Sequence, residues 1–181
     1  MMKKTTPHLA ELLRLRLADC HARLAQVRGV EHLAQTLARE AGAFLILEDH
    51  PWLRAAAAFL SDYPDKKTQV VSKVENWAGM PAKQDTVVIV GLGAVPETGS
   101  LLLSDHSQVG WWLSLCPCRQ IVVIPEDHAF LTMTVALELT AREPSGLVSW
   151  ITGPSRTADI EKVLVLGAQG ATDLLVITFR E

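Results

Sequence analysis

Short runs of consecutive apolar residues, separated by helical patterns, constrain the fold of this 181-residue chain more than any other feature. Such runs are typical of strands buried on both faces of a sheet, because half-exposed strands alternate apolar with polar residues. We expect strands at residues 43–47, 69–71, 86–90, 100–103, 120–125, 147–152 and 174–179. Strands that alternate with helices predict an α/β fold with a mostly parallel sheet flanked by helices.

Leucines at helical spacing predict an N-terminal helical pair within residues 7–41. The first helix is expected from Pro7 to Val27, where Gly29 ends it, and the second from Glu31 to Glu40. The pair would dock on the α/β body (43–181) or on another copy of the chain, with residues 1–181 forming a single domain. Later helices are expected at 51–60, 126–142 and 158–166.

Composition excludes several functional classes. Hydrophobic residues make up 49% and charged residues 20% of the chain, which is typical of a globular protein. The net charge of −3 and the pI near 6.1 provide no basic field for nucleic acid or anionic lipid. No apolar run reaches the roughly 20 residues that span a bilayer, and no leader pattern is present, so we expect a cytoplasmic protein. Three cysteines, an odd number, argue against a secreted disulfide framework.

A polar loop follows the predicted strand at 147–152. Hydroxyls and backbone N–H groups at a helix start suit an anion, and an arginine there could bind a carboxylate or phosphate with two hydrogen bonds. The alternative is structural: the hydroxyls cap the next helix and the arginine pairs with a carboxylate of the same loop. The candidate ligand-binding residues of this loop are Gly153, Pro154, Ser155, Arg156, Thr157, Asp159 and Glu161.

A second candidate segment lies at residues 91–100, where three glycines allow tight turns or close approach to a ligand. It is no dinucleotide-binding fingerprint, because the Gly-x-Gly-x-x-Gly spacing is absent. Glu97 could act as a general base or a nucleophile if it is desolvated. The alternative is a surface glutamate in a hairpin. Thr98, Gly99 and Ser100 are the candidate ligand-binding residues beside it.

Both segments resemble the LUD-domain family, that is, lactate-utilization protein C and its relatives. The motif that carries this resemblance is Gly-Pro-Ser-x-Thr-x-Asp-Ile-Glu at 153–161, together with Glu-Thr-Gly-Ser at 97–100. The resemblance implies the fold shared by ribose-5-phosphate isomerase, glucosamine-6-phosphate deaminase and CoA transferases. It also implies a role in oxidising L-lactate to pyruvate beside iron–sulfur partner subunits. In CoA transferases of this fold a glutamate attacks the acyl group, and Glu97 occupies a comparable glycine-rich setting.

The chain departs from the family pattern in two places. Relatives carry His-Gly-Pro near the C-terminus, where this chain has Gln169, Gly170 and Ala171. Relatives also carry Leu-Pro-x-x-His-Ile, where the segment 115–121 of this chain has Gln120 in place of the histidine. Two histidines that could serve as acid, base or ligand are therefore missing.

Three functions follow as competing hypotheses. The first is an accessory or assembly subunit of a lactate-oxidising system, without a cofactor or metal of its own. The second is an enzyme that binds an acyl-CoA, sugar phosphate or carboxylate through Glu97 and the 153–161 loop. The third is a metal or redox protein built on Cys116 and Cys118, with His106, His128 or Cys20 as further ligands, although a structural zinc site needs four. Buried, inert cysteines are the alternative to the third hypothesis.

Overall fold

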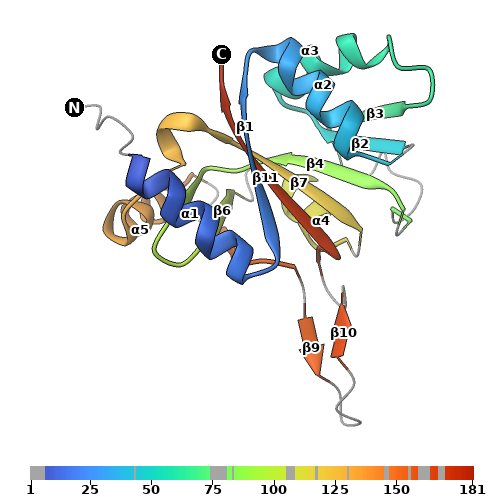
Figure 1. The fold of residues 1–181 in the computed structure, drawn as a ribbon. Coiled ribbons are helices and arrows are strands. Elements are labelled where there is room, and N and C mark those ends of the chain that lie inside the picture. Colours follow the sequence, from blue (N-terminus) through green and yellow to red (C-terminus); the bar gives the residue numbers. More distant parts are fainter. Residues whose placement is uncertain are drawn as a thin grey trace.

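The fold is built on a six-stranded parallel sheet, seen in a computed structural model that describes most of the chain (Figure 1). The described residues are 7–42, 44–73, 81–82, 84–104, 109–116, 118–129, 131–144, 147–154, 156–158, 164–166 and 170–181, with the backbone alone at Pro7, 156–158 and 164–166. The strand order is β1-β11-β7-β4-β2-β3, and each neighbouring pair is parallel. The strands are β1 (Ala22–Arg28), β2 (Phe44–Glu48), β3 (Lys67–Val71), β4 (Thr86–Val90), β7 (Arg119–Pro125) and β11 (Asp173–Arg180). The predicted α/β class is confirmed.

Both faces of this sheet are buried, which explains the continuous apolar runs. Side chains of one strand alternate between two core clusters: Val122 and Ile124 of β7 face one cluster, whereas Ile121 and Val123 face the other. Helices α2 (Val30–Glu40) and α3 (Pro51–Leu60) cover the second face. The first face is covered by α1 (Pro7–Asp19), α4 (Val109–Ser114) and part of a smaller sheet. Figure 1 shows these two layers on opposite sides of the main sheet.

The smaller sheet is antiparallel and has the order β5-β6-β8. Its strands are β5 (Gly93–Val95), β6 (Ser100–Ser104) and β8 (Val148–Ile151). Helix α5 (Met133–Arg142) packs beside it, after a 3₁₀ turn at Glu126–His128. The single helix expected over 126–142 is therefore wrong in its first part: Thr132 caps α5, its Oγ1 accepting a hydrogen bond from Val135 N at 3.3 Å.

Two further corrections concern elements that were expected to be helical. The first helix ends at Asp19, because His21 adopts a left-handed φ of 60° and turns the chain into β1. The N-terminal helices α1 and α2 are therefore separated by an edge strand that pairs with β11 from the other end of the chain. The predicted helix at 158–166 is replaced, in its described part, by a hairpin of β9 (Arg156–Ala158) and β10 (Leu164–Leu166), which projects from the main sheet in Figure 1.

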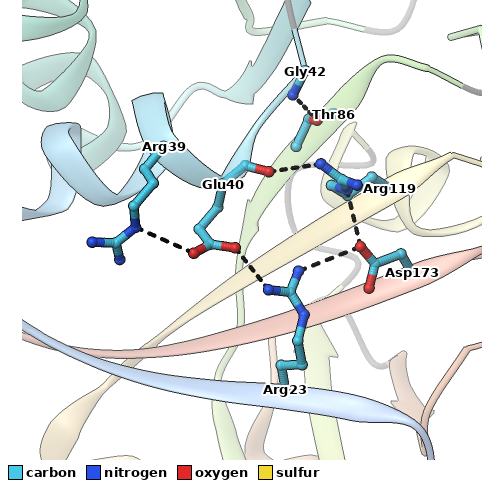
Figure 2. Close-up of polar contacts among 7 residues, drawn as sticks. All are labelled: Arg23, Arg39, Glu40, Gly42, Thr86, Arg119 and Asp173. Atoms are coloured by element: carbon cyan, nitrogen blue, oxygen red, sulfur yellow. Dashed lines mark hydrogen bonds and ion pairs between the residues drawn. The ribbon is translucent and has the colours of Figure 1, made fainter.

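The amino ends of the central strands are tied to the end of α2 by charged side chains. Figure 2 shows that Arg23 of β1 and Arg119 of β7 each contact both Glu40, at the end of α2, and Asp173 of β11. These contacts fix the amino-terminal edge of the sheet. The buried Gln120 follows Arg119 directly in β7. Over the residues described, none of the helices is long and apolar enough to cross a membrane.

Candidate functional site

The structure brings the Glu97–Ser100 turn next to the start of the 153–161 loop. Strands β6 and β8 are antiparallel, so the first residue of β6 lies beside the residue that follows β8. Ser100 Oγ and Thr152 Oγ1 are 2.7 Å apart and share a hydrogen bond. Gly153 and Pro154 follow directly and are buried. The two segments, distant in sequence, therefore meet at one place.

The hydroxyls at this junction satisfy one another. Thr98 Oγ1 donates to Ser100 Oγ at 2.8 Å, and Ser100 N donates back to Thr98 Oγ1 at 3.3 Å. Ser100 is buried, whereas Thr98 and Glu97 are exposed. The Glu97 side chain therefore lies at the surface, whereas a catalytic role as nucleophile or general base was expected only if this side chain is desolvated. Its catalytic role stays a prediction.

Close packing against the end of α1 and the residue after it requires glycine at positions 99 and 153. Gly99 has φ 71° and Gly153 has φ 80°, both in the left-handed region. A Cβ on Gly99 would lie 3.1 Å from the backbone carbon of Arg16, and a Cβ on Gly153 would lie 2.5 Å from the carbonyl oxygen of Cys20. The carboxyl end of α1 therefore sits directly over both turns. Only a residue without a side chain permits this approach.

Several predicted ligand-binding residues lie beyond this description. Ser155, Asp159 and Glu161 are outside the described residues, and Arg156 and Thr157 are placed by their backbone alone, in β9. The rule that ligands bind at the carboxyl ends of parallel strands does not apply to this loop, because β8 belongs to the antiparallel sheet. What the loop binds stays a prediction.

A cavity of about 300 Å³ is lined in part by Gly153. Its wall combines the end of α4, the beginning of β7, strand β8 and the residues before β11. The lining residues are Ser114, Leu115, Gln120, Ser149, Trp150, Ile151, Gly153, Gly170 and Ala171. Gln120, Gly170 and Ala171 belong to the two places where the chain departs from the LUD-domain pattern. The sequence marked Gln120 and Ala171 as departures, but it did not indicate that they line one cavity.

Gln120 is the buried polar side chain of this wall, with no exposed surface. Its Nε2 donates to the carbonyl oxygens of Ser114 at 2.7 Å, Cys116 at 3.1 Å and Leu113 at 3.4 Å. These carbonyls lie at the end of helix α4 and in the turn after it. Leu113 O also accepts a hydrogen bond from Cys116 N at 3.1 Å, and Cys116 O accepts one from Cys118 N at 2.9 Å. Gln120 therefore closes the end of α4 with its amide nitrogen.

Cys116 and Cys118 are buried thiols in the same region. Both are fully covered, and burial raises the pKa of Cys116 to about 11. Burial also raises the pKa of Cys118 to about 12, with a further contribution from Cys116. A cysteine binds a metal ion as its thiolate, which a raised pKa disfavours. Within the described ranges, no group of three His, Cys, Asp or Glu side chains lies close enough together to hold a metal ion. His128 instead contacts Leu92 O through Nδ1 at 3.0 Å, and His106 lies outside the described residues.

Comparison with known proteins identifies the relatives of this chain. The family model of the LUD domain matches residues 20–178. A Deinococcus radiodurans protein named lactate utilization protein C is 32% identical over 132 residues, which are 70% of this chain and 57% of the relative. A Bacillus subtilis protein of the same name is 33% identical over 81 residues, 41% of this chain and 33% of the relative. The chain thus spans little more than half of the first relative and a third of the second.

A crystal structure of a DUF162 family protein from Deinococcus radiodurans has the same fold, with a TM-score of 0.66. It is 21% identical, and the superposition covers 98% of this chain and 99% of that protein. The likeness therefore includes the N-terminal helices and the edge strand, and not only the C-terminal half that carries the sequence motifs.

Proposed function

Because the chain belongs to the LUD-domain family, we propose that it is an accessory or assembly subunit of an L-lactate utilization system, which oxidises lactate to pyruvate. The observation that carries the proposal is the family match over residues 20–178, together with the curated relatives named lactate utilization protein C. The expected partners are iron–sulfur subunits of that system, and the expected location is the cytoplasm. The proposal assigns no chemical step to this chain.

The geometry of the junction supports an accessory role over a catalytic one. Glu97 and Thr98 are exposed, and the hydroxyls of Thr98, Ser100 and Thr152 are joined in a row by hydrogen bonds. An exposed turn of this kind offers polar groups to a partner surface, where a rim of hydrogen bonds and charges adds specificity. Glu97 and Thr98 would then contact a protein partner.

A pull-down from the native host tests this proposal. Tagged chain from lactate-grown cells should recover partner proteins with the visible absorption of iron–sulfur clusters, and deletion of the gene should slow growth on lactate. Glu97→Gln should weaken recovery of the partners, whereas Glu138→Gln on the exposed face of α5 serves as the matched control. Unchanged growth on lactate after deletion would contradict the proposal.

The contact between Ser100 and Thr152 supports a second candidate, a small-molecule enzyme or binder that uses Glu97 and the 153–161 loop. Arg156, Ser155 and Thr157 would then hold the carboxylate or phosphate of an acyl-CoA, a sugar phosphate or a 2-hydroxy acid. Thermal-shift measurements with these compounds separate the two candidates. A ligand at 100 times its dissociation constant stabilises the folded state by about 2.7 kcal/mol, which raises the melting temperature by several degrees.

A further inference from the structure

Strand β1 forms an edge of the main sheet, because among the described residues it pairs with β11 alone. Gly29 N donates to Arg180 O at 2.8 Å, so the backbone at position 29 faces β11. Backbone N–H and C=O groups alternate in direction along a strand, and those of Leu24 and Gln26 therefore face outward. Within the described part of the chain, no hydrogen-bond partner reaches these outward groups.

A groove of about 590 Å³ lies between this strand and α1. Figure 1 shows α1 and β1 diverging from the turn that joins them, so the groove opens toward the carboxyl end of β1. It is lined by Ala10, Glu11 and Arg14 of α1, by Leu24, Gln26 and Arg28 of β1, and by Glu126. An edge strand with a helix beside it is the geometry in which an extended peptide adds to a sheet.

The outward positions of β1 carry none of the features that usually block strand addition. Exposed edges are commonly protected by proline, by charged side chains or by a bulge, whereas positions 24 and 26 are leucine and glutamine. The neighbouring Arg23 points to the other face of the sheet, where Glu40 holds it at 2.7 Å. The edge at Leu24 and Gln26 is therefore open to a partner strand.

The groove carries an excess of positive charge, although the whole chain has a net charge of −3. Arg14 donates to both carboxylate oxygens of Glu11, at 2.9 and 2.7 Å, and Glu126 lies 3.6 Å from Arg180. Arg28 also lines the groove and has no carboxylate partner within the described ranges. Three arginines thus accompany two carboxylates, which favours an acidic occupant.

We infer that an extended, acidic segment of a partner protein adds to the main sheet as a strand along β1, with a carboxylate on Arg28. Main-chain hydrogen bonds to Leu24 and Gln26 would supply affinity, and the charge of the groove would select the segment. The inference does not depend on the proposed role in lactate utilization, and this surface shares no residue with the Glu97–Ser100 turn.

Two libraries of acetylated hexapeptides test the inference. Valine and threonine alternate with aspartate or glutamate in one library and with lysine in the other. The full chain should bind members of the acidic library only. In the ¹⁵N-labelled chain with the tightest peptide, the backbone amides of Leu24 and Gln26 should shift and should exchange with solvent more slowly. Methylation of peptide nitrogens that face β1 should weaken binding at least several-fold, whereas methylation of the alternate nitrogens should have little effect.

Variants of the chain separate strand addition from charge alone. Arg28→Gln should weaken the acidic peptide about 2- to 5-fold, as expected for an exposed ion pair, and Arg142→Gln, in the last turn of α5, should have no effect. Gln26→Pro removes an outward N–H without removing a bond to β11 and should abolish binding.

Three results would overturn the inference: no binding from the acidic library, equal weakening by both sets of N-methyl peptides, or unchanged amides at Leu24 and Gln26. Sedimentation provides a further check. A dimer of the chain that Gln26→Pro converts to a monomer would also overturn it, because a second copy would then occupy the edge.

Discussion

Arg119 and Asp173 are direct neighbours in register at the amino ends of β7 and β11, and their side chains are joined by a hydrogen bond of 2.9 Å from Nε to Oδ2. The same guanidinium donates from Nη1 to the carbonyl oxygen of Glu40 at 2.8 Å. A cation that bonds a terminal carbonyl stabilises the carboxyl end of a helix. Arg119 therefore links two central strands to the last turn of α2 (Figure 2).

Replacing Arg119 with methionine should lower the free energy of unfolding. Hydrogen bonds to charged groups contribute about 1.5–3 kcal/mol, but the Arg119 side chain is 41% exposed, and screening by solvent reduces this to about 1–2 kcal/mol. Urea unfolding measures the difference. Arg14→Met is the control, because among the described residues Arg14 pairs with Glu11 alone, on the solvent side of α1, and its loss should not shift the midpoint. A loss as large in the control would contradict the role of Arg119.

The carboxylate of Glu40 should make stability depend on pH in the acid range. Its hydrogen bond from Arg23 Nη1 at 2.7 Å lowers the pKa of Glu40 below its ordinary value of 4.5, although desolvation acts in the other direction. A lowered pKa in the folded state gives stability that is present above pH 4.5 and is lost as the pH falls through the lowered value. The free energies of unfolding of the native chain and of Glu40→Gln should therefore begin to converge as the pH falls below about 4.5, and meet below the lowered pKa. A difference that stays constant down to pH 3 would argue against this coupling.

The sequence predicted the buried strands well, because a continuous apolar run indicates by itself that both faces of the strand are buried. Residues 87–90 and 121–124 are apolar at every position and alternate between the two core clusters, so local pattern and tertiary role agree. Strand β1 was missed, because Ala22–Arg28 mixes arginine and glutamine with apolar residues as an amphipathic helix also does. Its partner is β11, about 150 residues later, and only that long-range pairing decides its structure.

The candidate site was predictable only in part. The motifs at 97–100 and 153–161 indicated two segments, and the hydrogen bond between Ser100 and Thr152 joins the end of the first to the residue before the second. The cover that α1 provides over Gly99 and Gly153 is not encoded locally, since it depends on how a distant helix packs. The cavity lined by Gln120 could not be predicted from the sequence either, because its wall comes from four separate segments of the chain.

Cys116 and Cys118 should resist thiol reagents in the folded protein. Their raised pKa values of about 11 and about 12 leave almost no thiolate at pH 8, and both side chains are fully buried. An aromatic disulfide reagent at pH 8 should label Cys20 in the native protein and all three cysteines in denaturant, with mass spectrometry identifying the sites. Rapid native labelling of either buried cysteine would contradict the burial. Above pH 9 the unfolded thiols ionise first, so stability should fall as the pH rises toward 11.

Gly153→Ala should destabilise the protein more than Gly29→Ala. Both glycines have positive φ values, 80° and 77°, so both substitutions carry backbone strain of about 1–3 kcal/mol. Among the residues with described side chains, a Cβ at position 29 meets nothing within 4 Å, whereas at position 153 it would lie 2.5 Å from Cys20 O and 2.8 Å from Cys20 Cβ. The chain therefore has to move α1 away from the junction to admit the methyl group. Urea unfolding gives the two free-energy losses, and faster hydrogen exchange in α1 of Gly153→Ala alone would report the displacement. An equal loss in the free energy of unfolding for the two variants would mean that the close approach at Gly153 adds no steric cost.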